Sequence, residues 1–294
     1  MIFKGSMVAL VTPFYKDTVD TNTLQELVAW HVEQGTEAIV IAGSTGESLL
    51  LSEEERITAI KAAVKSRQES GNKIKIIANV GAPGTREAVR MAQDAKDCGV
   101  DGIMIITPCY VKPTQAESLE HFKTVVHSVK LPTIIYNHPF RTGTALQVQT
   151  LVDLCSAVDL IDAIKDSSNN LDFIAQLRLQ LPEKVGIVSG DDSINIGFLA
   201  HGACGIISVT ANVFPKLCKQ FMDAWKNGDC KRAFDIHQKL MPVHKAMFCE
   251  PNPCPAKFAL FKMGKIKNEV KRPLLPIDEN SKSAEIILES MQGL

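Results

Sequence analysis

Eight short apolar runs, each rich in β-branched residues, recur along the chain with longer mixed stretches between them. The runs are Met7 to Val11, Ala38 to Ile41, Ile74 to Ala78, Gly102 to Ile106, Thr133 to Tyr136, Leu160 to Ile164, Val185 to Val188 and Gly205 to Val209. Their apolarity is continuous rather than alternating, which indicates strands buried on both faces. The spacing of roughly 20 to 38 residues leaves room for a helix between consecutive strands and favours parallel pairing. Eight such units predict an α/β fold, a closed (β/α)8 TIM barrel rather than a doubly wound sheet.

Helical patterns fill most of the intervals and continue past the last run. They cover Asn22 to Gln34, Glu53 to Glu69, Arg86 to Cys98, Gln115 to Ser128, Gln147 to Cys155, Leu171 to Gln180, Lys231 to Met247, Ala256 to Met263 and Ala284 to Gln292. Ser52 precedes three glutamates, so its hydroxyl is suited to cap the helix that follows. Because no strand pattern follows Val209, we predict a barrel over residues 1–225 and a C-terminal helical region over residues 226–294.

Charge and hydropathy exclude several classes of protein. The 32 basic and 33 acidic residues give a net charge of -1 without a block of one sign, so we expect no nucleic-acid partner. The chain has neither a signal-peptide pattern at its start nor a stretch of about 18 apolar residues. We therefore expect a cytoplasmic protein that does not associate with a membrane. Its eight cysteines lack disulfide or zinc spacing, so we expect reduced, mostly buried thiols and no metal.

A single lysine, Lys165, stands where the sixth predicted strand ends. Burial among apolar residues disfavours the ammonium form and lowers the pKa of a lysine from about 10.4. Such an amine is a nucleophile that forms a Schiff base with a carbonyl substrate. The stretch alone leaves open the alternative that the side chain extends its ammonium group to water.

In a barrel of this kind the active site lies where the carboxyl ends of the strands meet their loops. The second strand runs into Gly43-Ser44-Thr45-Gly46-Glu47-Ser48, a turn rich in hydroxyls and free amides. Its glycines let the backbone approach a ligand, and its donors are suited to a carboxylate. A phosphate is a weaker candidate because the lysine of a P-loop is missing. A capped turn into the next helix stays an alternative.

Tyrosines stand at the ends of the fourth and fifth predicted strands. One is Tyr110 in Thr107-Pro108-Cys109-Tyr110, and the other is Tyr136, which begins Tyr136-Asn137-His138-Pro139-Phe140-Arg141-Thr142-Gly143. A tyrosine hydroxyl titrates near about 10 and can pass protons while staying neutral at pH 7. Arg141 is suited to a two-point contact with a substrate carboxylate. For His138 we expect loop packing rather than catalysis, because the tyrosines and the lysine already supply the acid–base groups.

Together, and in this order, these motifs resemble the dihydrodipicolinate synthase family of the pyruvate-dependent class I aldolases and lyases, a superfamily that includes N-acetylneuraminate lyase. The resemblance covers essentially the whole chain and extends to Ser189-Gly190-Asp191-Asp192, Gly205 to Asn212 and Glu250-Pro251-Asn252-Pro253. It implies a lyase that condenses pyruvate with L-aspartate 4-semialdehyde through a Schiff base. The product would be 4-hydroxy-tetrahydrodipicolinate, in lysine and diaminopimelate biosynthesis. No cofactor is implied.

The resemblance also implies roles for particular residues and an assembly. Lys165 would condense with pyruvate, and Arg141 would bind the carboxylate of the semialdehyde. The proton relay would be formed by the hydroxyls of Tyr136, Ser44 and Tyr110. The pyruvate carboxylate would be held by Thr45 and by the backbone at Ile207. Tyr110 would reach into the site of a neighbouring subunit, because the family typically forms a homotetramer, a dimer of tight dimers.

Two departures from the family pattern and three alternatives accompany this interpretation. Ser44 replaces the usual threonine, which keeps the hydroxyl but loosens its rotamer, so we expect activity to survive. Asp166-Ser167-Ser168-Asn169 replaces the more usual Glu-Ala-Ser/Thr-Gly/Asp, a change for which the sequence offers no interpretation.

The alternatives are a sugar-acid aldolase, which has no use for Arg141, a barrel that binds a keto acid without turnover, and a scaffold. Because partners of the family's lysine effector are missing, we expect L-lysine to inhibit weakly or not at all.

Overall fold

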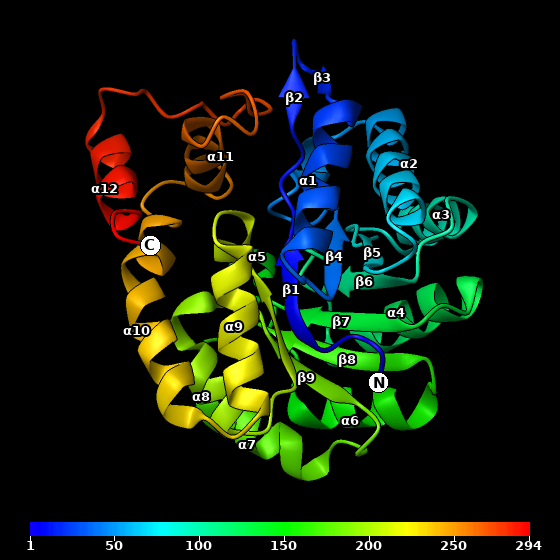
Figure 1. The fold of residues 1–294 in the computed structure, drawn as a ribbon. Coiled ribbons are helices and arrows are strands. Elements are labelled where there is room, and N and C mark those ends of the chain that lie inside the picture. The colour runs from blue at the N-terminus through cyan, green and yellow to red at the C-terminus, as the bar shows by residue number, and fades with distance from the viewer. The chain divides into compact units, whose positions relative to one another are not determined.

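The computed structural model describes residues 1–294, and its eight parallel strands form a closed barrel (Figure 1). Around the barrel the order is β1-β10-β9-β8-β7-β6-β5-β4. The strands are β1 (Gly5–Ala9), β4 (Ala38–Ile41), β5 (Lys75–Asn79), β6 (Gly102–Ile106), β7 (Thr133–Asn137), β8 (Ile161–Asp166), β9 (Gly186–Ser189) and β10 (Gly205–Ser208). The predicted (β/α)8 barrel is confirmed, with small shifts at the strand ends.

Twelve helices accompany the strands. They are α1 (Thr21–Glu33), α2 (Glu53–Glu69), α3 (Thr85–Asp97), α4 (Gln115–Val129), α5 (Pro139–Thr142), α6 (Val148–Ala157), α7 (Leu171–Gln180), α8 (Asn195–Ala200), α9 (Pro215–Lys226), α10 (Cys230–Ala246), α11 (Cys254–Lys262) and α12 (Lys282–Ser290). The sequence prediction missed α5, α8 and the hairpin of β2 (Phe14–Tyr15) and β3 (Thr18–Val19), because such short elements carry too little periodicity.

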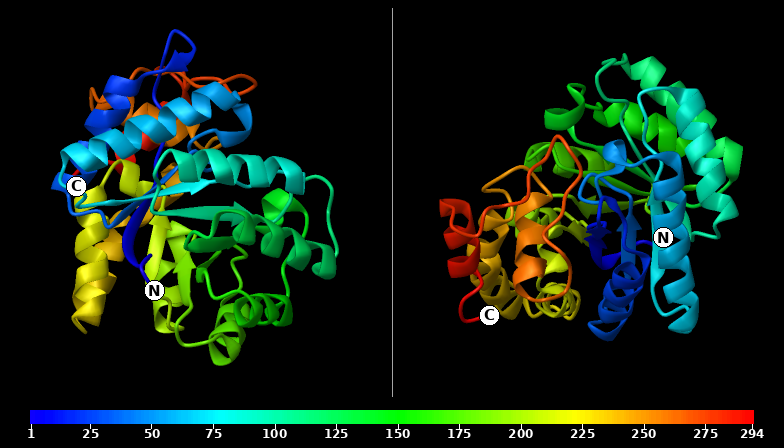
Figure 2. Two further views of the ribbon diagram at one scale, coloured as in Figure 1. Left: turned by 90° about the vertical axis from the view of Figure 1, so that its right-hand side faces the viewer. Right: turned by 90° about the horizontal axis from the view of Figure 1, so that it is seen from above.

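The elements group into two compact units, which we describe separately. One comprises Met1–Lys4 and Ile77–Ile207, and the other Gly5–Ile76 and Ser208–Leu294. In the first unit α3 packs on α4 and α6 packs on α7. In the second, α1 lies beside α2, and α9 lies beside α10 (Figure 2). No strand follows β10, and the division proposed at residue 225 stays a prediction.

Burial explains why the strands read as continuous apolar runs. Every residue of β4 is buried, and so are all five of β7, although Thr133 and Asn137 are polar. The ring of Phe3 fills the space beside Gly102, where an added Cβ atom would lie 2.4 Å from the phenyl Cζ and 2.6 Å from the carbonyl oxygen of Pro132. The backbone amides of Ile2 and Phe3 donate hydrogen bonds to the Asp162 carboxylate at 2.8 and 2.9 Å. This start of the chain is thus packed into the first unit.

Local signals behave as expected at helix ends. The Ser52 hydroxyl accepts a hydrogen bond from the Glu55 amide, and the Glu55 carboxylate accepts one from the Ser52 amide. This capping box confirms Ser52 as the start of α2. A second box, formed by Thr114 and Glu117, begins α4.

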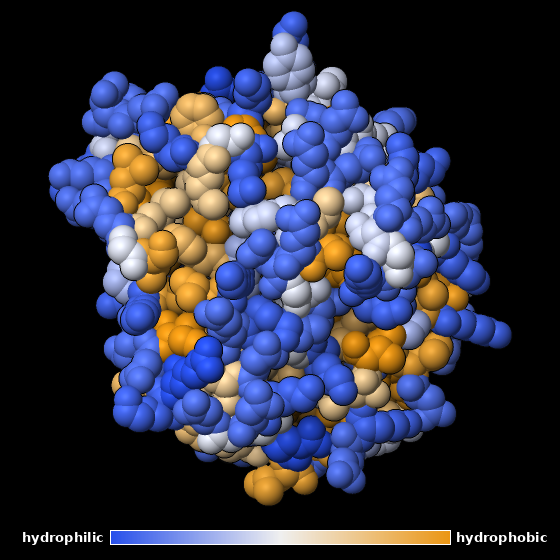
Figure 3. Space-filling model, in the orientation of Figure 1, coloured by the Kyte–Doolittle hydropathy of each residue, from blue (hydrophilic) through white to orange (hydrophobic).

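The surface and the cysteines add two findings. No helix is both long and apolar enough to cross a membrane. On the face drawn in Figure 3, hydrophilic residues predominate, and apolar residues gather where α10, α11 and α12 lie.

All eight cysteines are free thiols, but the expectation that most are buried is wrong, because only Cys155, Cys218 and Cys254 are buried. Most of the others lie at half-buried positions on loops and helix ends.

Candidate active site

Lys165 lies inside β8 rather than beyond its end. The strand was predicted to end at Ile164, but Lys165 pairs with Tyr136 of β7 and with Val188 of β9, which extends β8 to Asp166. The lysine is only 5% exposed, and its Nζ lies 4.0 Å from the centroid of the Tyr136 ring. A lysine whose ammonium extends to water is therefore excluded.

Burial changes the protonation of both groups of this pair. It lowers the pKa of Lys165 to about 7, a shift that Asp192 opposes and Arg141 reinforces. Burial also raises the pKa of Tyr136 to about 12, although the hydrogen bond between Tyr136 and Ser167 opposes that shift. Near pH 7 a large share of the amine is thus neutral and lies beside a phenol that keeps its proton. An amine nucleophile next to a proton donor is suited to carbinolamine and imine chemistry.

Ser167 lies beside the pair of Lys165 and Tyr136, and the sequence interpretation gave it no role. Its hydroxyl oxygen lies 3.3 Å from the hydroxyl oxygen of Tyr136, and the residue is buried. Gly190 leaves the room for this arrangement, because an added Cβ atom there would lie 2.2 Å from Ser167 Oγ and 2.7 Å from Lys165 Cε. The only signal in the sequence was that Ser167 belongs to a departure from the family pattern.

Asp166 ties the ends of β7 and β8 together. Its carboxylate accepts hydrogen bonds from Asn137 Nδ2 at 2.6 Å, from the Ser168 amide at 2.9 Å and from the Ser168 hydroxyl at 2.7 Å. Burial raises the pKa of Asp166, and these three donors oppose the shift. The network fixes the backbone that directly follows Lys165.

The loop after β7 carries His138 and Arg141. His138 precedes α5, and its ring centroid lies 5.6 Å from that of Tyr136. Burial lowers the pKa of His138 to about 4, with Arg141 and Lys165 adding to the shift, so the imidazole is neutral at pH 7. Arg141 lies on α5 with an exposed side chain; its backbone amide donates a hydrogen bond to the His138 carbonyl oxygen at 3.0 Å, and its guanidinium has no hydrogen bond or ion pair. Its guanidinium is therefore free to receive an anion.

Tyr110 and Ile207 lie at the ends of two other strands. Ile207 is buried in β10. Tyr110, in the loop after β6, is 92% exposed and has a positive φ of 70°. A left-handed conformation is uncommon for a bulky residue. Nothing in its own unit covers the tyrosine ring.

In the second unit, β4 leads into the loop that holds Ser44 and Thr45. Ser44 is half-buried, and Thr45 is buried, with its hydroxyl oxygen accepting a hydrogen bond from Asn252 Nδ2 at 3.0 Å. The Thr12 hydroxyl donates to the carbonyl oxygen of Gly46 at 2.8 Å. The loop is thus held from two other segments of its unit.

A buried ion pair holds the end of the same loop. Glu47 has a positive φ of 60°, and its carboxylate accepts hydrogen bonds from Lys257 Nζ and from the Lys271 amide, both at 2.7 Å. The side chains of Glu47 and Lys257 are fully buried. Burial lowers the pKa of Lys257 to about 8 although the carboxylate of Glu47 raises it. The Lys257 ammonium also lies 4.1 Å from the centroid of the Phe14 ring.

The comparison with known proteins decides the family. A model of the Dihydrodipicolinate synthetase family matches residues 2–289. The chain belongs to this family. The family assignment made from the motifs is confirmed.

Individual members of the dihydrodipicolinate synthetase family are similar over nearly the whole chain. The 4-hydroxy-tetrahydrodipicolinate synthase of Aquifex aeolicus is 42% identical over 282 residues, which are 95% of each chain. The crystal structure of dihydrodipicolinate synthase from Aquifex aeolicus aligns with a TM-score of 0.92 at 40% identity, covering 98% of this chain and 96% of that one. A chloride-inhibited enzyme from Acinetobacter baumannii, complexed with pyruvate, aligns with a TM-score of 0.93 at 39% identity, covering 99% and 98%.

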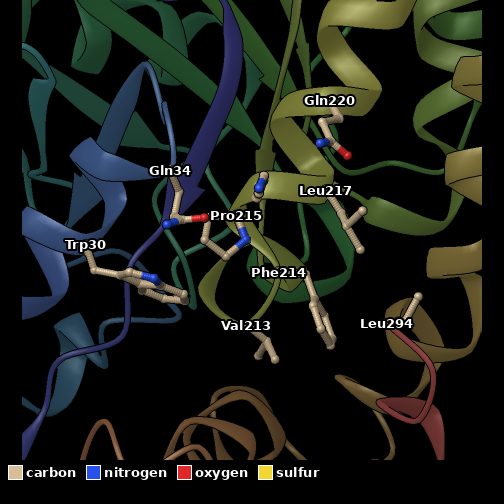
Figure 4. Close-up of a pocket in the computed structure, with 9 residues that line it drawn as sticks. Trp30, Gln34, Val213, Phe214, Pro215, Leu217, Gln220 and Leu294 are labelled. Carbon is tan, nitrogen blue, oxygen red and sulfur yellow. The ribbon is translucent and has the colours of Figure 1, made fainter.

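In this member of the dihydrodipicolinate synthetase family, an open surface hollow holds none of the predicted site residues. It has a volume of about 380 Å³ and is lined by α1, α9 and the chain end (Figure 4). Trp30 and Gln34 face it from α1, while Phe214 and Leu217 face it from the α9 side. Its lining is mostly apolar, and Lys216 is its only charged residue. The hollow therefore does not combine a buried amine with a tyrosine hydroxyl, as imine chemistry requires.

Proposed function

We propose that this chain is a 4-hydroxy-tetrahydrodipicolinate synthase, which condenses pyruvate with L-aspartate 4-semialdehyde in lysine and diaminopimelate biosynthesis. The observation that carries the proposal is the buried Lys165 amine stacked on Tyr136 in a chain of this family. Relatives of that name are about as long as this chain and align over nearly all of it.

The reaction follows from the chemistry of a buried amine. Lys165 Nζ adds to C2 of pyruvate, and the carbonyl oxygen leaves as water, which gives an imine. Loss of a proton from the pyruvate methyl group gives an enamine, whose carbon attacks the aldehyde carbon of the semialdehyde while the aldehyde oxygen takes up a proton. The amino group of the semialdehyde then adds to the imine carbon, closes the ring and releases the Lys165 amine.

The roles of the remaining residues are proposed from the family pattern. Tyr136, Ser44 and Tyr110 move protons through their hydroxyls. Thr45 and the backbone at Ile207 hold the pyruvate carboxylate, and Arg141 binds the carboxylate of the semialdehyde. The neutral phenol of Tyr136 and the free guanidinium of Arg141 support these assignments.

A pair of activity assays tests the function. Purified protein should turn over pyruvate with aspartate 4-semialdehyde and should not cleave N-acetylneuraminate. The two reactions are measured side by side, each with a coupled assay of its product. Turnover of N-acetylneuraminate alone would replace the synthase by a sugar-acid aldolase. Absence of both activities, together with absence of a trapped pyruvate adduct, would leave only the binding or scaffold alternatives.

Replacing Arg141 by lysine should weaken the binding of the semialdehyde more than the binding of pyruvate. A point charge does not reproduce the planar two-point contact of a guanidinium with a carboxylate, so we expect the KM for the semialdehyde to rise by about tenfold or more. The KM for pyruvate should stay nearly constant. Equal losses for both substrates would indicate structural damage to α5 instead. Full retention of activity would contradict the role of Arg141 and favour the sugar-acid alternative.

We further propose a homotetramer, a dimer of tight dimers in which Tyr110 enters the active site of the neighbouring subunit. The exposed ring of Tyr110, its left-handed backbone and the exposed Val111 beside it support this assembly. A large apolar residue held in such a conformation on the surface is suited to a contact with another copy.

Co-expressing two slow variants tests whether Tyr110 of one subunit acts in the active site of another. Lys165→Ala and Tyr110→Phe should each be slow when purified alone. When the two are co-expressed, a mixed dimer has one site that combines an intact Lys165 with the Tyr110 of the other chain, so activity should recover in that site. Sedimentation checks that assembly is intact. Activity no higher than the sum of the separate variants would show that Tyr110 does not serve a partner's site.

A further inference from the structure

The departure at residues 166–169 brings an additional hydroxyl group to the proposed catalytic tyrosine. Ser167 Oγ lies 3.3 Å from Tyr136 Oη, within hydrogen-bond distance, and either oxygen can be the donor. Both residues are only 5% exposed, so water does not surround the pair. An alanine, which is usual here in the family pattern, has no group to offer the phenol.

The backbone fixes the position of Ser167 from both sides. Its amide donates a hydrogen bond to the Asn137 carbonyl oxygen at 2.9 Å, which continues the pairing of β7 and β8 by one step. The preceding Asp166 is held by Asn137 and Ser168. On the other side, Gly190 closes the space around Ser167 Oγ and Lys165 Cε so tightly that no side chain fits there. The hydroxyl is thus part of a rigid arrangement and not a mobile surface group.

A buried phenol that exchanges protons needs a partner for each of its two forms. The neutral form has a proton whose direction must be set, and the phenolate form has a charge that burial makes unfavourable. A serine hydroxyl can accept a hydrogen bond from the phenol and donate one to the phenolate. The hydrogen bond of Ser167 opposes the burial that raises the pKa of Tyr136 to about 12. Hydrogen bonds to the charged form stabilise it more than those to the neutral form.

We propose that Ser167 is a positioning residue that orients the Tyr136 hydroxyl and stabilises its phenolate during proton transfer. This inference rests on the proposed function, because it assigns Ser167 a task within the same imine reaction. Ser167 acts through Tyr136, so its contribution exists only while the phenol is present. A serine that merely fills space beside Gly190 would contribute equally with or without the phenol. The two possibilities therefore differ in a double-mutant cycle.

The cycle compares Ser167→Ala in two backgrounds. With Tyr136 intact, the substitution should lower kcat by about three- to tenfold, the effect of losing one hydrogen bond. In the Tyr136→Phe background it should change kcat by less than about twofold. Ser167→Thr keeps the hydroxyl and should restore most of the loss. Ser168→Ala is the matched control, because the Ser168 hydroxyl bonds to Asp166 and not to Tyr136, so any loss should be equal in both backgrounds.

Two further readouts separate this inference from the proposed function. Borohydride trapping of pyruvate should give the same final yield of adduct in Ser167→Ala as in the unsubstituted enzyme, and circular dichroism should show the same thermal transition. An unchanged kcat in Ser167→Ala, or an equal loss in both Tyr136 backgrounds, overturns the positioning role while the synthase assignment stands. An unsubstituted enzyme that neither traps pyruvate nor forms product overturns the proposed function itself.

Discussion

Replacing Lys165 by alanine should lower kcat by about three orders of magnitude or more, because the amine that forms the covalent intermediate is removed. In the unsubstituted enzyme, borohydride reduction in the presence of pyruvate should add a reduced pyruvyl group to the peptide that contains Lys165. Mass spectrometry of the digested protein locates the adduct. The alanine variant should carry none.

The protonation state of Lys165 adds a pH dependence to this result. Its pKa of about 7 means that the ammonium form dominates at lower pH, and only the neutral amine adds to pyruvate. The initial rate of trapping with cyanoborohydride should therefore fall about tenfold per pH unit below pH 7 and level off about one unit above it. Lys184→Ala, which removes an exposed lysine paired with Asp159, is the control and should behave like the unsubstituted enzyme. An adduct on any other lysine would contradict the assignment.

Replacing Lys257 by methionine should destabilise the protein by about 3–5 kcal/mol, because the carboxylate of Glu47 is then buried without its counterion. Only the amide of Lys271 remains as a partner for that carboxylate. Since Glu47 ends the loop that holds Thr45, the pyruvate KM should rise in the folded fraction as well. Urea unfolding followed by circular dichroism gives the change in the free energy of unfolding.

Two companion variants show whether charge or packing causes this loss. Lys262→Met removes a lysine of the same helix, α11, whose 2.8 Å pair with Glu279 is largely exposed, and it should cost less than about 1 kcal/mol. The double variant Lys257→Met with Glu47→Gln removes both buried charges and should recover part of the stability. A Lys257→Met protein as stable as the Lys262→Met protein would mean that the buried pair is not needed.

The barrel and its strands were readable from the sequence because burial leaves a direct trace. Eight continuous apolar runs are what eight strands buried on both faces require, and Lys165 stood out because it follows one of them. The extension of β8 through Lys165 and Asp166 was not readable, because polar residues at a strand end look like the start of a loop. Only the pairing with β7 and β9 reveals that they continue the strand.

The supports of the candidate site were not readable for a different reason. Glu47 and Lys257 are 210 residues apart in the chain, and nothing in the sequence indicates that they form a pair. Ser167 was noticed, but its meaning depends on the 3.3 Å distance to a hydroxyl on another strand. The family pattern supplied the proposed roles of Tyr110 and Arg141, whereas the exposure of both side chains came only from the structure.

The packing of Phe3 against Gly102 has an evolutionary consequence. A side chain at position 102 collides with the phenyl ring and also with the carbonyl oxygen of Pro132, so no single substitution relieves both contacts. The carbonyl oxygen of Pro132 belongs to the backbone, so this contact persists whatever side chains stand at positions 3 and 132, and family members should keep glycine at position 102 even where the residue at position 3 varies. The opening of the chain and the backbone before β7 thus both limit which mutations the start of β6 can accumulate.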